Sequence, residues 1–313
     1  MPRGYIGNTD HDWYNFLRQQ KNLDEVNFWQ PSGGRNFHSV RPGEPFFFRL
    51  KSPYKAIGGF GFFTRHSVAS AALAWDAFGV KNGAPDWRTM HARIEKYRRD
   101  RGGEHMPGGN YQIGCLMISH PVFFAPEDWV PEPAGWAQNI VSGMGVDTTI
   151  GEGQRIFEAC LDLALTRHDP NRPQLPDIQR DKYGTPILVQ PRLGQGIFRL
   201  AVTDAYDRAC AVTREHSLPV LEAAHIRPYG TDGEHQVSNG LLLRADLHKL
   251  FDRGYVTVTP ELVFEVSSRL KQDFDNGKIY YDLHGQKLYE PPRKDEKPDR
   301  VALQWHNEAV FLG

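Results

Sequence analysis

The chain has 313 residues, 40% of them hydrophobic and 24% charged, so it is long enough for about two domains with cores of their own. Its 37 Lys and Arg residues nearly balance its 38 Asp and Glu residues, which gives a formal net charge of −1. This balance excludes a uniformly basic nucleic-acid coat, because any attraction to DNA must come from a local positive surface.

No apolar run approaches the roughly eighteen residues that a membrane span needs, and no charged and then apolar leader follows Met1. We therefore expect a cytoplasmic protein with no membrane partner. Cys115, Cys160 and Cys210 lie far apart and are never spaced as C-x-x-C, which excludes a disulfide framework and a four-cysteine zinc site. We expect three buried thiols.

Short β-like runs alternate with helical patterns between residues 5 and 124, which is typical of a mixed α+β domain. The expected elements, in chain order, are helix 12–19, strand 46–50, strand 59–63, helix 67–78, helix 86–99 and strand 113–118. Phe46, Phe47, Phe60 and Phe62 are expected in the core of this domain.

Prolines and glycines punctuate residues 121–153, so we expect the crossover between the two domains there. A helix over 153–168, a proline-rich loop over 169–191 and an apolar helix from about Gly196 should follow. The predicted organisation is a first domain over 1–145, a helical and loop linker over 146–190, and a second domain over 191–313.

In the second domain His225, Asn239 and His248 have the spacing H-x13-N-x8-H. The flanking residues predict a strand over 220–226, a polar loop, a turn, and a strand leading into a helix over 241–251. This order should bring both imidazoles to one point. His225, whose ring titrates near neutral pH, is the expected general base, His248 the expected metal ligand, and Asn239 a residue that holds the turn through backbone hydrogen bonds.

The words AAHIRP, SNGLLLR and DLHKLFDRG in this segment resemble the HNH nucleases. The resemblance implies a ββα-metal fold, in which a hairpin packs on a helix around one divalent cation, Mg²⁺, Mn²⁺ or another transition metal. Ala224 stands where many members carry a second metal ligand. The ligand set therefore stays open between Asp252, Asp246, and a cation that His248 holds with phosphate and water alone.

Charged residues surround the expected catalytic segment. Asp246 has a second interpretation as a helix-capping residue or a solvated carboxylate. Four basic residues are expected to contact DNA phosphates, or else to remain solvated: Arg227, Arg244, Lys249 and Arg253.

The first domain contains the words YIGNTDHDW, EVNFWQPSGGRNF, RPGEPFFFRL and KAIGGFGFF, followed by AWDAFG. Over residues 1 to 125 they are similar to an EVE domain, a small β-barrel of the PUA-like group. The resemblance implies a reader that holds one modified base, swung out of the duplex, in an aromatic pocket. A tryptophan face stacks on a base with roughly 1–3 kcal/mol, while polar groups read the base edge.

We expect Trp29 and Trp75 to stack on the base, and Asn8, Thr9 and Asp10 to contact its edge. Asp10 would accept a hydrogen bond from an exocyclic amine such as that of cytosine. Trp75 has a core position as its alternative, because it stands in a helical pattern. A basic run over 88–101 suits contact with the DNA backbone or a solvated helix face.

The predicted fold is therefore α+β, with an N-terminal PUA-like (EVE) β-barrel with flanking helices and a C-terminal HNH ββα-metal nuclease domain. The predicted function is a modification-dependent, type IV-like restriction endonuclease acting on double-stranded DNA with 5-methylcytosine or a related modified cytosine. We expect a homodimer, since one such site cuts one strand. Two alternatives stay open: an HNH nuclease without modification dependence, and a catalytically inert nucleic-acid-binding protein.

Overall fold

The computed structural model describes residues 3–33, 37–100, 102, 109–137, 139–166, 193–228 and 236–313. The chain divides into two compact units, residues 1–197 and 198–313, which we describe one at a time. The expected loop over 169–191 and most of the polar loop after Pro228 lie outside the described residues. Within the described part, no helix has the length and apolarity to cross a bilayer.

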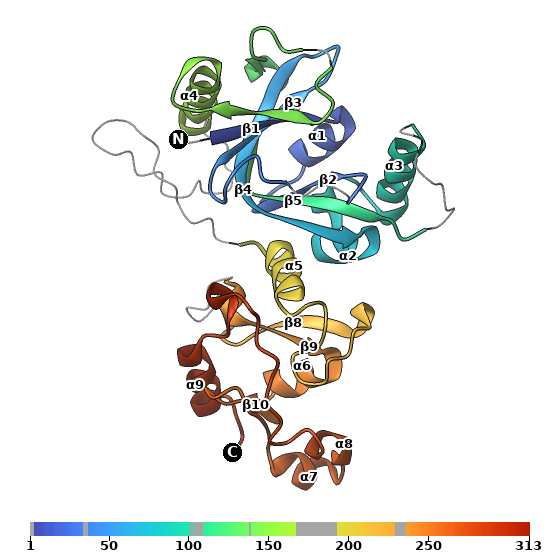
Figure 1. Cartoon of the computed structure of the whole chain (residues 1–313), viewed down its shortest axis with the longest axis vertical. Coiled ribbons are helices and arrows are strands. Elements are labelled where there is room, and N and C mark those ends of the chain that lie inside the picture. The colour runs from blue at the N-terminus through green and yellow to red at the C-terminus, as the bar shows by residue number, and fades with distance from the viewer. Residues whose placement is uncertain are drawn as a thin grey trace, which may run out of the picture. The chain divides into compact units, whose positions relative to one another are not determined.

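The described strands of the first unit form one seven-stranded sheet in the order β2-β5-β4-β3-β1-β7, with β6 paired to β4 (Figure 1). In chain order the elements are β1 (Arg3–Thr9), α1 (His11–Arg18), β2 (Glu25–Gln30), β3 (Pro45–Leu50), β4 (Ala56–Ser70), α2 (Ala71–Phe78), α3 (Trp87–Arg99), β5 (Gln112–Phe123), β6 (Val130–Pro131), β7 (Gly143–Asp147) and α4 (Gly151–Thr166).

Among the described residues the path of the sheet ends at β2 on one side and at β7 on the other, and no pairing joins these two strands, so the expected closed barrel is not found there. The order depends on a parallel pair between β1 and β3 and on the 15-residue strand β4, which pairs with β3, β5 and β6. A local periodicity indicates strands but carries no information on which strands pair.

Alternation along β3 places aromatic rings on both faces of the sheet. Phe46 and Phe48 join the core cluster that α1 covers, whereas Phe47 joins the cluster that α4 covers. Phe60 and Phe62 belong to the second cluster, and none of these five side chains is more than 8% exposed. The predicted core positions are confirmed.

The first unit extends beyond residue 145. β7 pairs with β1, and α4 buries Ile156 and Phe157 against the sheet, so the linker expected over 146–190 does not begin at residue 146. The unit reaches Ile197 because the Glu25 carboxylate accepts hydrogen bonds from the backbone N–H groups of Gly196 (2.7 Å) and Ile197 (2.9 Å). All three cysteines are buried thiols, as expected.

The second unit is built around an antiparallel hairpin followed directly by a helix. Its elements are β8 (Leu221–His225), β9 (Gly240–Arg244), α6 (Ala245–Asp252), β10 (Val256–Val258), β11 (Phe264–Val266), α7 (Arg269–Phe274), α8 (Lys278–Tyr281) and α9 (Arg300–Ala309), and helix α5 (Gln195–Ala205) leads into it. β8 and β9 pair with His225 opposite Gly240. The predicted strands and the helix that follows them are confirmed at β8, β9 and α6, whereas most of the predicted polar loop lies outside the described residues.

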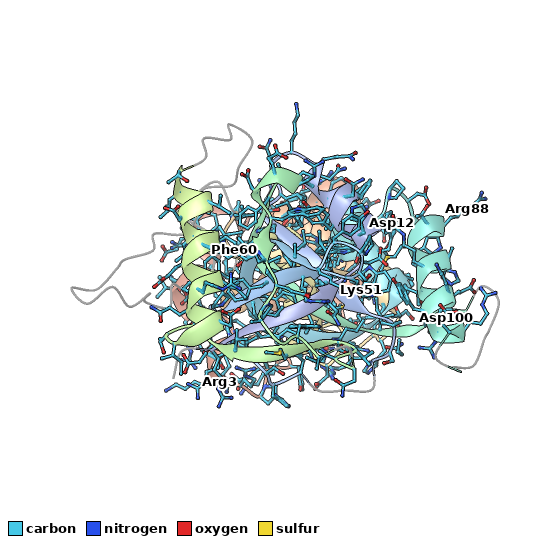
Figure 2. All side chains as sticks on the ribbon, turned by 90° about the horizontal axis from the view of Figure 1, so that it is seen from above. Arg3, Asp12, Lys51, Phe60, Arg88 and Asp100 are labelled. Carbon is cyan, nitrogen blue, oxygen red and sulfur yellow. The ribbon has the colours of Figure 1, made fainter. Side chains whose placement is uncertain are left out.

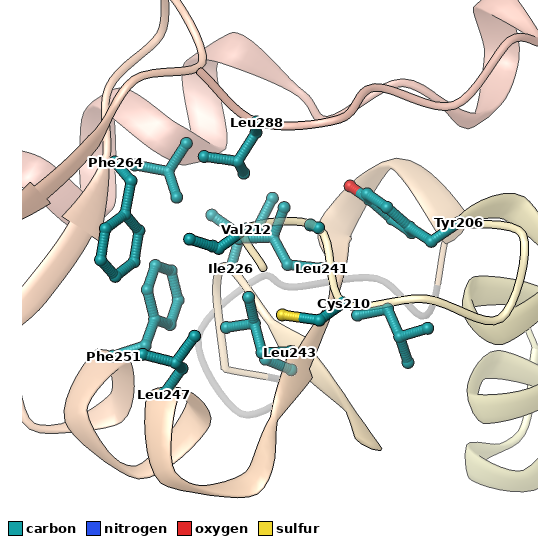
Figure 3. Packing of buried hydrophobic residues seen from close by; sticks show 14 of the residues in the cluster. Tyr206, Cys210, Val212, Ile226, Leu241, Leu243, Leu247, Phe251, Phe264 and Leu288 are labelled. Carbon is teal, nitrogen blue, oxygen red and sulfur yellow. The ribbon is translucent and has the colours of Figure 1, made fainter. Parts of the chain in front are cut away.

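Apolar side chains from the hairpin and from α6 form one core (Figure 3). Leu241 and Leu243 alternate along β9 and meet Leu247 and Phe251, which are one turn apart on α6. Phe264 from β11 closes the cluster, and all five side chains are at most 1% exposed. This packing fixes α6 against the hairpin and thereby positions the polar side chains of both.

Candidate functional site

His225 and His248 line one pocket of 340 Å³ in the second unit. His225 ends β8, and its ring stacks on Phe198 with 3.9 Å between centroids and 10° between planes. His248 stands on α6, and Trp305 of α9 contributes to the opposite part of the lining. The structure therefore brings the two expected histidines together.

Two carboxylates flank the ring of His248. Its Nδ1 atom lies 2.7 Å from Oε2 of Glu222, and its Nε2 atom lies 3.4 Å from Oδ2 of Asp252. A carboxylate accepts hydrogen bonds, so the Nδ1–H group donates to Glu222 and the neutral ring keeps its lone pair on Nε2. The lone pair is thus on the side of Asp252, a lining residue of the pocket.

The pair formed by His248 and Asp252 fits a divalent cation. Two ligands about 2.1 Å from a cation and about 100° apart lie about 3.2 Å from each other, close to the observed 3.4 Å. Glu222 bonds the other ring nitrogen and cannot share that cation. Among the described residues no group of three or more His, Cys, Asp or Glu side chains could hold a metal ion. His248 and Asp252 therefore form a candidate pair whose remaining ligands would have to be phosphate and water.

Asp246, the other expected ligand, is engaged elsewhere. Its carboxylate accepts hydrogen bonds from Arg244 Nε (3.0 Å) and Nη2 (2.5 Å) and from the Tyr280 hydroxyl (3.3 Å). The hydrogen bonds from Arg244 hold the pKa of Asp246 below its usual range. Asp246 is not among the residues that line the pocket. We therefore remove it from the candidate metal ligands.

Asn239 clamps the backbone just beyond His225. Its Oδ1 atom accepts a hydrogen bond from the backbone N–H of Arg227 (2.9 Å), and its Nδ2 group donates to the carbonyl of Arg227 (3.0 Å). The carbonyl of Asn239 also accepts from the N–H of Ile226 (2.9 Å). These bonds fix the backbone at the end of the strand, next to His225. The Asn239 side chain therefore helps to position His225 and does not contact the reacting atoms.

The four expected phosphate contacts have different surroundings. The guanidinium of Arg227 lies over the ring of Trp305 at 5.4 Å, and Arg244 is paired with Asp246. Lys249 and Arg253 are exposed side chains on and just after α6. The exposed pair can reach a phosphate without breaking an ion pair.

His306 also lines the pocket, and the sequence analysis missed it. Its Nε2 lies 3.1 Å from the carbonyl of Phe251 and so donates to it, which leaves Nδ1 to accept from the Thr257 hydroxyl at 2.8 Å. The ring is 2% exposed and stacks on Phe251. Burial lowers the pKa of His306 to about 4, so this histidine is a neutral part of the core and not a proton acceptor.

The first unit contains a separate cavity of 440 Å³, within the range of about 300–1,000 Å³ that is typical of small-molecule sites. Its aromatic lining consists of Trp13, Phe28, Trp29 and Tyr97. Its polar and aliphatic lining includes Asn8, Asp10, Gln30, Ser32, Lys51, Val141 and Ser142. Trp29 and Tyr97 meet edge to face, with 6.2 Å between centroids, and form one corner of the cavity.

Asp10 is ionised inside this cavity. Burial raises the pKa of its carboxyl, but hydrogen bonds from the Tyr97 hydroxyl and from the N–H of Asp12, with the charge of Lys51, outweigh burial and leave the pKa below its usual value. Tyr97, which the sequence analysis missed, thus lines the cavity and donates a hydrogen bond to the carboxylate of Asp10. A hydrophobic residue pattern on α3 gives no sign of this contact with the residue that caps α1.

Three of the expected base-contacting residues have other roles. The Asn8 side chain donates to the carbonyls of Ile140 and Val141, so it holds a loop. Thr9 is fully buried, and its hydroxyl donates to the carbonyl of Gly7. Trp75 stands on α2 and does not line the cavity. Of the expected set, Trp29 and Asp10 remain as candidate base contacts.

The hairpin, the helix and the two histidines define the class of site found in metal-dependent nucleases. Residues 210–259 match a family model described as HNH endonuclease, so the second unit carries an HNH endonuclease domain. A search of curated proteins gave no match.

Two solved structures are similar to this chain at low identity. A mutant of the ZmASCH protein from Zymomonas mobilis is 10% identical with a TM-score of 0.32, covering 50% of this chain and 96% of its own. The modification-dependent TagI restriction endonuclease is 12% identical with a TM-score of 0.28, covering 92% of this chain and 75% of its own.

Proposed function

We propose that the protein is a metal-dependent endonuclease that cuts double-stranded DNA carrying a modified cytosine. The observation that carries the proposal is the pocket shared by His225 and His248, because both histidines lie within the residues that match the HNH endonuclease family. Hydrolysis of a phosphodiester needs a base for water and stabilisation of the charge on phosphate oxygens, and this pocket offers side chains for both.

The residues in and around this pocket have separate roles in the proposed reaction. His225 takes a proton from the attacking water, with its ring held in place by the stack on Phe198. His248 and Asp252 hold a divalent cation, which supplies Lewis-acid stabilisation of the phosphate when it is bound. Glu222 orients the His248 ring through Nδ1, in the manner of a carboxylate behind a metal-binding histidine. Lys249 and Arg253 contact the DNA backbone.

The cavity of the first unit is the proposed reader, in line with the resemblance of that region to EVE domains. Trp29 and Tyr97 offer aromatic surfaces for a base that has left the stack. The ionised Asp10 accepts a hydrogen bond from the exocyclic amine of cytosine, an amine that thymine lacks. Because one nuclease site cuts one strand, we propose that two copies of the chain act together on a duplex.

The nuclease part of the proposal is tested with supercoiled plasmid DNA and Mg²⁺ or Mn²⁺. The full chain should nick or linearise a plasmid with modified cytosines, and His225→Ala should slow the reaction by at least about a hundredfold, since general bases contribute about 10²–10⁴-fold. His216→Ala removes an exposed histidine outside the pocket and should cut at the parental rate. Cutting by His225→Ala at that same rate would refute the assignment.

A further inference from the structure

Val141 occupies an unusual place at the rim of the reader cavity. It contributes to the lining of the cavity, yet its side chain is 66% exposed. Single exposed apolar residues are ordinary on protein surfaces and need no ligand to explain them. Val141 differs because it stands at the mouth of an aromatic cavity, where any bound base must enter.

The backbone around Val141 is held firmly. Asn8 donates from Nδ2 to the carbonyls of Ile140 (2.7 Å) and Val141 (3.2 Å), and the backbone N–H of Asn8 donates to the carbonyl of Ser142 (2.9 Å). Three consecutive carbonyls of the loop therefore bind one residue of β1. The loop cannot turn the valine inward without breaking these bonds.

Asn8 is itself fixed from the opposite side. Its Oδ1 atom accepts a hydrogen bond from Arg49 Nη1 (2.7 Å), and Arg49 is 6% exposed and paired with Glu132. The guanidinium also lies over the ring of Trp136 at 4.4 Å. The polar contacts from Arg49 to Asn8 and from Asn8 to the loop thus hold the backbone of Val141, whose apolar side chain is exposed to solvent.

Removal of a base from a duplex leaves a gap in the stack, and proteins that distort DNA commonly insert apolar side chains between base steps. Lys51, which also lines the cavity, suits this task less well, because it carries a charge that matches phosphate rather than base faces. Figure 2 labels Lys51 near the middle of the first unit in this view, away from Arg88 and Asp100 at the two ends of α3.

We propose that Val141 is a wedge that enters the DNA duplex and fills the space left by the base held in the cavity. The inference rests on the proposed reader function, and its partner is the base pair step beside the extruded nucleotide. Asn8 and Arg49 are positioning residues for the wedge, which explains why the Asn8 side chain is committed to the loop and not to the base.

The experiment compares duplex with single-stranded DNA, because a single strand has no gap to fill. The full chain with His225→Ala, which prevents cutting, is titrated against a labelled duplex with one 5-methylcytosine and against the same strand alone. Val141→Ser should weaken binding to the duplex about tenfold and leave binding to the single strand unchanged. Val141→Leu should restore duplex binding.

A matched control and a second readout complete the test. Ile150→Ser removes a side chain of equal exposure, 65%, that does not line the cavity, and it should bind both DNAs at parental affinity. With 2-aminopurine beside the modified cytosine, the fluorescence increase on binding should be smaller for Val141→Ser than for the parent.

Any of the following results would overturn the wedge. An equal loss on both DNAs would indicate a general defect of the cavity, and duplex binding at parental affinity by Val141→Ser would show that the side chain fills no gap. Equal affinity of the parent for modified and unmodified duplexes would remove the reader function, and the wedge with it. If Val141→Ser keeps both the preference for the modified base and the parental affinity, the wedge is refuted and the reader function stands.

Discussion

Glu222 and His248 share a hydrogen bond of 2.7 Å between strand β8 and helix α6. The bond occupies Nδ1 of the imidazole and leaves the lone pair on Nε2, which lies 3.4 Å from the carboxylate of Asp252. A residue on the first strand thus decides which nitrogen of a helix residue can bind a metal, before any metal is present.

The first prediction concerns this bond. Glu222→Gln keeps an acceptor beside Nδ1 but removes the charge, so affinity for Mn²⁺ should fall about 10- to 100-fold, as is typical when the partner of a metal-binding histidine is changed. Titration calorimetry with the full chain measures the affinity without DNA. Glu261→Gln removes an exposed charge elsewhere and is the matched control. Unchanged affinity in Glu222→Gln would exclude the positioning role.

The second prediction separates the two aspartates of α6. Asp252→Asn should raise the Mn²⁺ concentration needed for half-maximal cutting at least about tenfold, because an amide oxygen is a weaker ligand than a carboxylate. Asp246→Asn should leave that concentration unchanged and lower the free energy of unfolding by about 0–1 kcal/mol, since its ion pair with Arg244 is partly exposed. An equal metal effect for both variants would contradict the ligand set.

The third prediction compares two tryptophans of the first unit. Trp29→Ala should weaken binding to modified DNA by about 1–3 kcal/mol, because the stacking surface is lost. Trp75→Ala should leave the preference for modified DNA intact, since Trp75 does not line the cavity. Competition binding measures the preference, and circular dichroism confirms that both variants are folded. A lost preference in Trp75→Ala alone would move the reader site to α2.

The sequence predicted the parts of the nuclease site whose geometry is local. His225, Asn239 and His248 fall on a hairpin and the helix that follows it, so spacing and turn residues were sufficient to bring the histidines together. Glu222 was missed although it is a charged residue in the short strand LEAAH that ends with His225, a signal that could have been used. The sequence left Asp246 open between a metal ligand and a capping or solvated carboxylate, and its pairing with Arg244, two residues earlier, favours the second interpretation.

Contacts distant in the chain were beyond local patterns. Tyr97 and Asp10 are 87 residues apart, and Asn8 reaches a loop more than 130 residues away. The parallel pairing of β1 with β3 and the order of the described strands leave no periodic trace either, so local patterns could not predict how these strands pair.

The fourth prediction is a pH dependence caused by His306. Its folded pKa is about 4 against the ordinary histidine value of 6.5 in the unfolded chain, so between these values the unfolded state binds more protons. The free energy of unfolding should therefore fall as the pH falls from 6.5 to 4, by about 3 kcal/mol in total. Urea unfolding of the parent and of His306→Gln at each pH isolates the contribution of His306 to the free energy of unfolding. Parallel pH curves for the two proteins would contradict the assignment.

The central claim joins a reader of modified cytosine to a metal-dependent cutter, and a matched-plasmid digest tests it most directly. One plasmid is prepared with and without 5-methylcytosine or 5-hydroxymethylcytosine and is incubated with the full chain and Mg²⁺ or Mn²⁺. We predict that a modified plasmid is cut and that the unmodified one remains supercoiled. Equal cutting of all plasmids would contradict the reader, and no cutting of any plasmid with either metal would contradict the nuclease.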